Sequence, residues 1–223
     1  MAKKNTAEED SKILEEVKTR FTACETWESD PRKKFVQDLK FANADPDNGW
    51  QWESTLKSNR ETDGKPCLTI NKTRQHNLQI TNDAKQNKPG VNIKPVGDGA
   101  SYDAAQVFEG VVRHIEYQSS AEQAYDTATM FQVQGGIGYW RVVTDYVSDD
   151  SFDQEIYIRR VKDPRAIYLD PDISQADGSD ARYGFVFEDV PADKFKADYP
   201  DDADQVSDKS SIGVDGTWAG KDY

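Results

Sequence analysis

The 223-residue sequence is poor in cysteine and has no long hydrophobic run. Its two cysteines, Cys24 and Cys67, form no Cys-x-x-Cys motif, which favours a reducing compartment and leaves a single disulfide open. No apolar run approaches the about 18 residues that a membrane helix needs. Residues 1–11 are too polar for a signal peptide. We therefore expect a protein that is made and kept in the cytosol, with no membrane partner.

Apolar residues are also scarce. They make up 36% of the chain, charged residues make up 31%, and the mean hydropathy is -0.86. This supply is thin for a compact monomer, so either part of the chain is loosely ordered or neighbouring subunits complete it. The aromatic content of 11%, with five tryptophans, argues against wholesale disorder.

The net charge of -13 lies mainly in the C-terminal third. Residues 145–223 contain 20 acidic and 9 basic residues, whereas residues 1–144 contain 21 and 19. Affinity for duplex DNA comes largely from Lys and Arg that displace counterions. We therefore expect no sequence-specific DNA binding and assign no residue to DNA contact.

Helical periodicity dominates the first 60 residues, which we predict to form a helical N-terminal arm. Apolar residues at helical spacing predict one helix over Glu8–Trp27. Asp30 and Pro31 then suggest a break and a second helix that ends at Asp45. From Asp47 to Pro66 we expect a loop with one short extended piece.

Residues 61–200 are predicted to form an α+β body. Residues Asn71–Asn87 have the spacing of a helix rich in amides, and Val91–Pro95 resembles a short edge strand. A helix that starts at Ser101 carries Ala104, Phe108, Val111 and Ile115 on one side, which we interpret as a core-facing stripe.

The next helix is predicted to begin with a capping box formed by Ser120 and Gln123. Its small residues Ala124 and Ala128 permit close packing of helices. Together these two helices form the helix pair of the body, which we expect to pack on a small, mostly antiparallel sheet.

Alternating segments after this helix pair predict the strands of that sheet. Tyr139–Val147 and Phe152–Val161 form an antiparallel hairpin in which we expect Trp140 to be buried. Further strands are predicted at Arg165–Leu169 and Tyr183–Glu188. A short helix over Pro191–Tyr199 follows, and residues 201–223 form an acidic, mobile segment.

The motifs that could carry chemistry fail their structural requirements. Gly135, Gly136 and Gly138 follow a helix and precede a strand, the reverse of a nucleotide-binding loop, so a tight turn is favoured. The acidic loop that starts at Asp170 lacks EF-hand spacing. His76 and His114 each lack a second metal ligand three or four residues away. We predict no catalytic, cofactor or metal site and no enzyme.

From Lys65 onward the sequence resembles the portal proteins of short-tailed bacteriophages. The matching blocks begin with residues 65–71, 111–117, 124–128, 135–142 and 150–156. They continue with residues 170–172, 177–183 and 195–200. Each block alone is common, whereas their order over residues 65–200 is specific to this family.

The resemblance implies a structural subunit of a head-tail connector ring, usually of twelve copies, at one capsid vertex of the virion. Such a ring admits and later ejects double-stranded DNA and contacts capsid and scaffolding proteins, a terminase motor and tail-completion proteins. Residues 61–200 would belong to the wing of the subunit. Family members are several hundred residues long, so we expect this chain to be a fragment or a truncated product without the family's stem and clip.

Two other functions remain open from the sequence. One is a nucleotide-binding enzyme centred on Gly135–Gly138. The other is an acidic adaptor that binds a basic protein through Ser148–Asp180.

Overall fold

The computed structural model describes residues 7–44, 52–88, 90–97, 99–148, 150–175, 177–188 and 190–200. The chain divides into two compact units, residues 1–185 and residues 186–223. In the first unit the helices are α1 (Ala7–Ala42), α2 (Ser54–Thr62), α3 (Thr73–Gln86), α4 (Tyr102–Gln118) and α5 (Ala121–Gly135). The strands are β1 (Trp140–Tyr146), β2 (Gln154–Arg160), β3 (Ile167–Leu169) and β4 (Gly184–Val186), and a 3-10 turn at Pro164–Ala166 precedes β3.

The second unit contains the short helix α6 (Ala192–Asp198), as the sequence predicted. The predicted mobile segment, residues 201–223, lies outside the described residues. The predicted division at residues 60 and 200 remains a prediction.

Helix α1 is continuous through Pro31, so the predicted break at Asp30-Pro31 is wrong. A proline inside a helix removes one backbone hydrogen bond and costs about 3 kcal/mol. Burial on both sides of Pro31 offsets that cost, because Phe21 and Cys24 precede it and Phe35 follows it, all in the core. The two predicted helices are therefore one helix.

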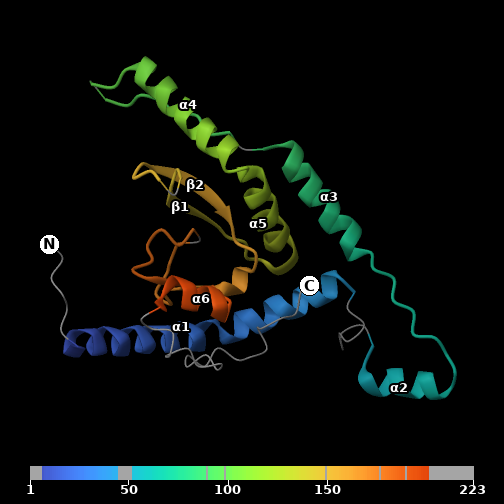
Figure 1. Cartoon of the computed structure of the whole chain (residues 1–223). Helices are drawn as coiled ribbons and strands as arrows, with labels where there is room; N and C mark the ends of the chain where they lie inside the picture. Colours follow the sequence, from blue (N-terminus) through green and yellow to red (C-terminus); the bar gives the residue numbers. More distant parts are fainter. Residues whose placement is uncertain are drawn as a thin grey trace. The chain divides into compact units, whose positions relative to one another are not determined.

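Arg32 and Glu28 attach α1 to the strand region (Figure 1). The Arg32 guanidinium donates to the backbone carbonyls of Arg165 and Ile167, and Arg32 Nε donates to Glu28 at 2.7 Å. Glu28 also accepts a hydrogen bond from the backbone N–H of Leu169 at 3.1 Å. Charged hydrogen bonds thus join segments more than 130 residues apart in the chain.

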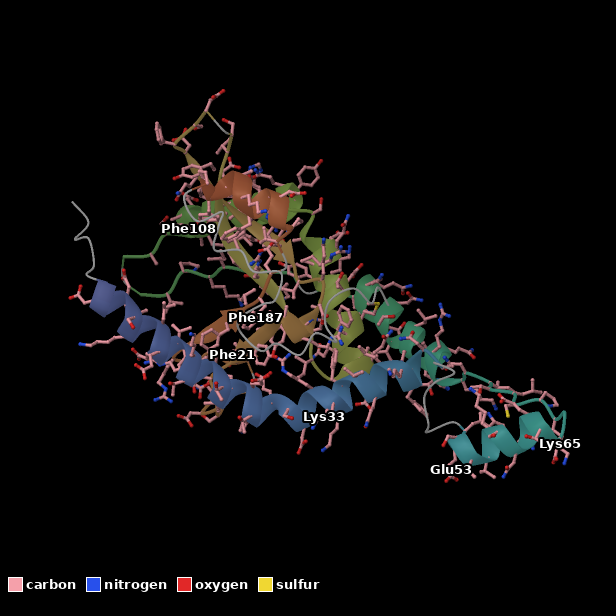
Figure 2. All side chains as sticks on the ribbon, turned by 60° about the horizontal axis from the view of Figure 1, so that its bottom comes forward. Phe21, Lys33, Glu53, Lys65, Phe108 and Phe187 are labelled. Carbon is pink, nitrogen blue, oxygen red and sulfur yellow. The ribbon has the colours of Figure 1, made fainter. Side chains whose placement is uncertain are left out.

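Aromatic contacts surround this attachment. The Arg32 guanidinium lies 3.4 Å from the centre of the Tyr168 ring, and Phe21 meets Tyr168 edge-on at 5.1 Å. Phe21 also contacts the Phe185 ring at 5.7 Å. Figure 2 shows Phe21 on the side of α1 that faces the strands, whereas Lys33 points away from them.

Two predictions between α1 and α4 are wrong. The segment predicted as a loop contains α2, which buries no residue and so lacks the apolar periodicity that would have revealed it. The edge strand predicted at Val91–Pro95 does not form, since its described residues make no strand pairing. The predicted amide-rich helix is confirmed as α3.

Helices α4 and α5 form the predicted pair, but two details differ. The Ser120 side chain makes no cap hydrogen bond, because its residue adopts a left-handed conformation with φ 49° between the helices. The predicted core-facing stripe of α4 is largely exposed, including Phe108 and Val111, and only Ile115 packs partly against the core. Helix α4 begins as predicted at Ser101, whose hydroxyl accepts from the Ala104 N–H.

Strands β1 and β2 form the predicted antiparallel hairpin, with Val142 opposite Ile158 and Thr144 opposite Ile156. Ile158 is buried against Ala121 and Ala124 of α5. The predicted burial of Trp140 is wrong, because Trp140 is 46% exposed. Its ring meets the Tyr125 ring edge-on at 5.2 Å. Trp140 is at the first position of β1 and opposite Arg160, at the end of the hairpin.

The architecture is α+β, as predicted, with helices packed on a small antiparallel β-hairpin. The strands form two separate two-stranded sheets, β1-β2 and β3-β4. Among the described residues, no helix combines the length and apolar character needed to cross a bilayer.

We predict that Arg32→Ala lowers the free energy of unfolding by about 3–5 kcal/mol, because it leaves Glu28 and two carbonyls without their charged partner. Chemical denaturation measures this change. Lys33→Ala is the matched control, since the Lys33 side chain is 71% exposed, and should shift stability by no more than about 0.5 kcal/mol. Equal effects of the two substitutions would contradict the role assigned to Arg32.

Candidate functional site

The glycine-rich segment after α5 is a tight helix-to-strand turn, as predicted. Gly136 caps the C-terminus of α5 in the left-handed region, with φ 88°. A Cβ on Gly138 would lie 1.9 Å from the carbonyl oxygen of Ala128. A helix C-terminus presents carbonyl groups, which repel phosphate, so this turn has the wrong polarity for a nucleotide.

The acidic loop between β3 and β4 binds its own backbone and arginine. Asp170 is only 1% exposed and accepts from Arg182 Nε at 2.9 Å. Asp180 accepts from the backbone N–H and the hydroxyl of Ser174 at 2.8 and 2.7 Å. These carboxylates have partners within the loop, and in the part of the chain that the structure describes no three metal-binding side chains converge.

Hydrogen bonds set the charge state of this loop. The hydrogen bond from Arg182 holds the pKa of the Asp170 carboxyl below its usual value. Backbone and hydroxyl hydrogen bonds from Ser174 lower the pKa of Asp180 in the same way. Both side chains are therefore ionised at neutral pH and stabilise the loop.

The remaining candidates for chemistry are the two cysteines and the two histidines. Cys24 and Cys67 are both free thiols, which removes the disulfide that the sequence left open. Burial, followed by the nearby Glu28 carboxylate, raises the pKa of the Cys24 thiol and disfavours its reactive thiolate. His76 lies on α3 and His114 lies on α4.

A small cavity beside the Arg32 attachment is too small for a ligand. It lies between Arg32 and Tyr139 and has a volume of about 20 Å³, enough for one water molecule. Burial, followed by the Glu28 charge, raises the pKa of the Tyr139 hydroxyl, which therefore stays neutral. This cavity is part of the fold.

The most prominent functional feature is exposed apolar surface on α4 and the β1-β2 hairpin. Phe108 is 62% exposed, and Val111, Val142 and Ile156 are also exposed. We call these four residues the α4-hairpin surface. Clusters of exposed large apolar side chains mark sites of protein association.

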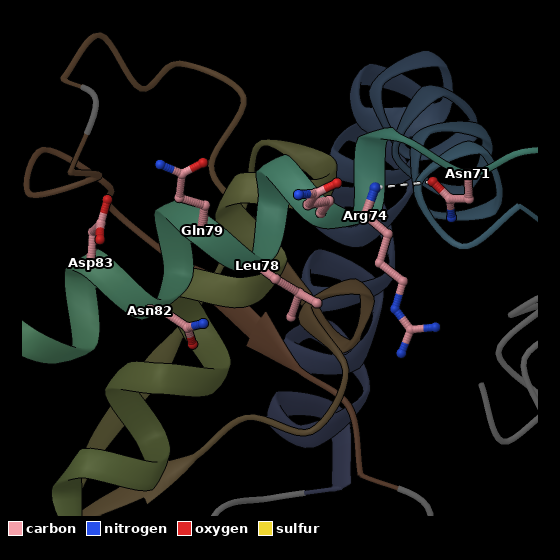
Figure 3. Close-up of a pocket in the computed structure, with 7 residues that line it drawn as sticks. Asn71, Arg74, Leu78, Gln79, Asn82 and Asp83 are labelled. Carbon is pink, nitrogen blue, oxygen red and sulfur yellow. Dashed lines mark hydrogen bonds between the residues drawn. The ribbon is translucent and has the colours of Figure 1, made fainter.

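Helix α3 carries a second exposed feature, a shallow groove of about 660 Å³. Asn71, Arg74, Leu78, Gln79 and Asn82 are among its lining residues, and Figure 3 shows them along α3. Arg74, Leu78 and Asn82 are four positions apart and so lie along one side of the helix. Thr73, Asn77 and Thr81 form a different face that is less exposed.

The sequence predicted the stripe of α4 that carries Phe108 and Val111, but assigned it to the core. Apolar spacing showed that α4 is amphipathic, yet it could not show whether the core or a partner covers the apolar side. The amide content of α3 correctly indicated a polar, weakly buried helix.

Comparisons with known proteins agree on one family. The model of the family described as "Phage P22-like portal protein" matches residues 18–222. The "Portal protein" of Acyrthosiphon pisum secondary endosymbiont phage 1 is 29% identical over 205 residues, which are 88% of this chain and 28% of that protein. The chain thus spans between a quarter and a third of the length of that relative.

We predict that Gly138→Ala destabilises the protein by about 1–3 kcal/mol, because the added methyl group collides with backbone at Ala128. Thermal unfolding measures the loss. Gly110→Ala is the control, since an added Cβ there meets no atom within 4 Å and alanine favours a helix. A neutral Gly138→Ala variant would show that the turn does not approach α5 this closely.

A second prediction concerns pH and Asp170. Because its folded-state pKa lies below the unfolded value of 3.8, its ionised form stabilises the fold above that pH. This stabilisation is lost as the pH falls through the folded pKa. Asp170→Asn should therefore be less stable than the wild type at pH 7, and the difference should disappear well below pH 3.8. Urea unfolding across this pH range, with the exposed Asp172→Asn as control, measures it.

Proposed function

Because the chain belongs to the phage P22-like portal protein family, we propose that it is part of a structural subunit of the portal ring. The ring stands at one capsid vertex of the virion, and phage DNA is packaged and ejected through it. Subunits assemble in the host cytoplasm. The observation that carries the proposal is the family match, which extends over residues 18–222.

Exposed apolar surface on the described fold supports this proposal. Phe108, Val111, Val142 and Ile156 are exposed in the single chain. Contact with an adjacent subunit would remove these apolar side chains from water, which is favourable.

The charge distribution suits a conduit for DNA. Residues 144–158, which include the hairpin turn, contain five carboxylates and no lysine or arginine. Such a surface repels phosphate, so the duplex passes without being held. A terminase motor supplies the energy for packaging, and capsid, scaffolding and tail-completion proteins are the other partners of the ring.

Assembly tests the proposed function directly. We expect mass photometry and negative-stain electron microscopy of the purified chain to show closed rings at increasing concentration. Monomers at every concentration and salt condition would contradict a ring subunit.

Phe108→Asp should weaken this assembly about tenfold or more, because it places a charge in the apolar contact. The stability of the monomer should change by no more than about 0.5 kcal/mol, since Phe108 is 62% exposed. Tyr117→Asp is the matched control, because Tyr117 is 87% exposed on the opposite side of α4 and should leave assembly unchanged. Equal effects on assembly would show that this surface makes no subunit contact.

A further inference from the structure

The tip of the β1-β2 hairpin combines exposed apolar side chains with negative charge. Phe152 is 96% exposed, and Tyr146 and Val147 beside it are also exposed. Asp150 and Asp153 lie within the same turn. The tip therefore presents the exposed Phe152 ring next to the carboxylates of Asp150 and Asp153.

Backbone hydrogen bonds join the described residues of this tip. The N–H of Val147 donates to the carbonyl of Asp153 at 3.0 Å, and the N–H of Ser151 donates to the carbonyl of Ser148 at 3.1 Å. The Ser151 hydroxyl also accepts from the N–H of Asp153 at 3.1 Å. A tip that is already ordered loses little conformational entropy when it binds.

The groove on α3 is lined mainly by amides, with one basic residue, Arg74, and one acidic residue, Asp83. Lys85 and Lys88 pair with Asp126 and Glu122 of α5, whereas Arg74 has no ion pair among the described residues. Leu78 adds an exposed apolar side chain to the same groove.

The groove also has fixed polar groups. Asn71 accepts a hydrogen bond from the backbone N–H of Arg74 at 3.0 Å and donates to the carbonyl of Ala42 at 2.8 Å. Gln75, Gln79 and Asn82 present amides that can bind the backbone of a turn. The groove therefore offers the hairpin tip one guanidinium, one exposed apolar side chain and several amides.

These two features lie on opposite sides of α5 in the first unit. Helix α5 packs against α3 on one side and against β2 on the other, and Figures 1 and 2 show the hairpin tip and α3 on opposite sides of it. A contact between two different patches of identical chains is heterologous, and its repetition gives a ring when the rotation between neighbours closes and an open filament when it does not.

We infer that the hairpin tip of one copy of this chain binds the α3 groove of the next copy, with Phe152 against Leu78 and Asp150 beside Arg74. The inference deepens the proposed function and rests on it, since the contact joins neighbouring subunits of the ring. The α4-hairpin surface then adds apolar burial to the same assembly.

Phosphate of nucleic acid is a less suitable occupant of the groove. Tight binding of DNA takes several basic side chains that contact phosphates in series. The groove presents Arg74 together with Leu78 and the carboxylate of Asp83. A partner that carries both an apolar residue and a carboxylate satisfies more of these groups.

Charge reversal tests the electrostatic part of the contact. Arg74→Glu and Asp150→Arg should each weaken assembly about tenfold, and the double variant should recover most of the loss. Lys33→Glu, which reverses an exposed charge on α1, should leave assembly unchanged. Absence of recovery in the double variant would overturn the pairing. Loss of DNA retention by Arg74→Glu with normal assembly would assign the groove to nucleic acid instead.

Disulfide trapping tests the geometry and separates the two proposals. In a Cys67→Ser background, the chain with Phe152→Cys and Gln79→Cys should give a ladder of covalent oligomers on oxidation. Phe152→Cys with Tyr117→Cys should not. Rings in the electron microscope without this ladder would overturn the tip-groove contact and leave the ring intact. Monomers alone, with no ladder, would overturn both proposals.

Discussion

The attachment of α1 by Arg32 and Glu28 is the interaction on which the described fold most depends. Helix α1 is long, and its N-terminal half carries exposed apolar residues that contribute little to its own stability. A guanidinium bound to two carbonyls, a carboxylate and the Tyr168 ring fixes its position on the strand region. Because both charges are largely removed from water, neither can lose its partner without a large cost.

The sequence predicted those parts of the fold that local patterns determine. Alternation predicted the β1-β2 hairpin, and glycine spacing predicted the turn before it, since both depend on residues close together in the chain. The same reasoning failed at Pro31, because contacts with residues 165–169 override its local preference. It failed for α2, which has no buried side chain to create a periodic pattern. The position of Trp140 at the end of the hairpin could not be inferred from alternation alone.

The candidate surfaces show the same limit. The apolar stripe of α4 and the amides of α3 are visible in the sequence, but amphipathicity is identical whether a core or a partner covers it. In the structure Ala105 is buried and Ile115 packs partly against the core, whereas Phe108 and Val111 are exposed. If the proposed ring forms, neighbouring chains cover these exposed surfaces.

Helix α5 gives this arrangement a mechanical consequence. Its buried face consists of Ala121, Ala124 and Ala128, whose side chains have no rotamers through which they could yield. If neighbouring subunits engage on its two sides, a load on the ring passes from one junction to the next through this helix. In that case the alanine contacts of α5 would be stiffer than the contacts between subunits. Under load the subunit contacts would deform before α5 does.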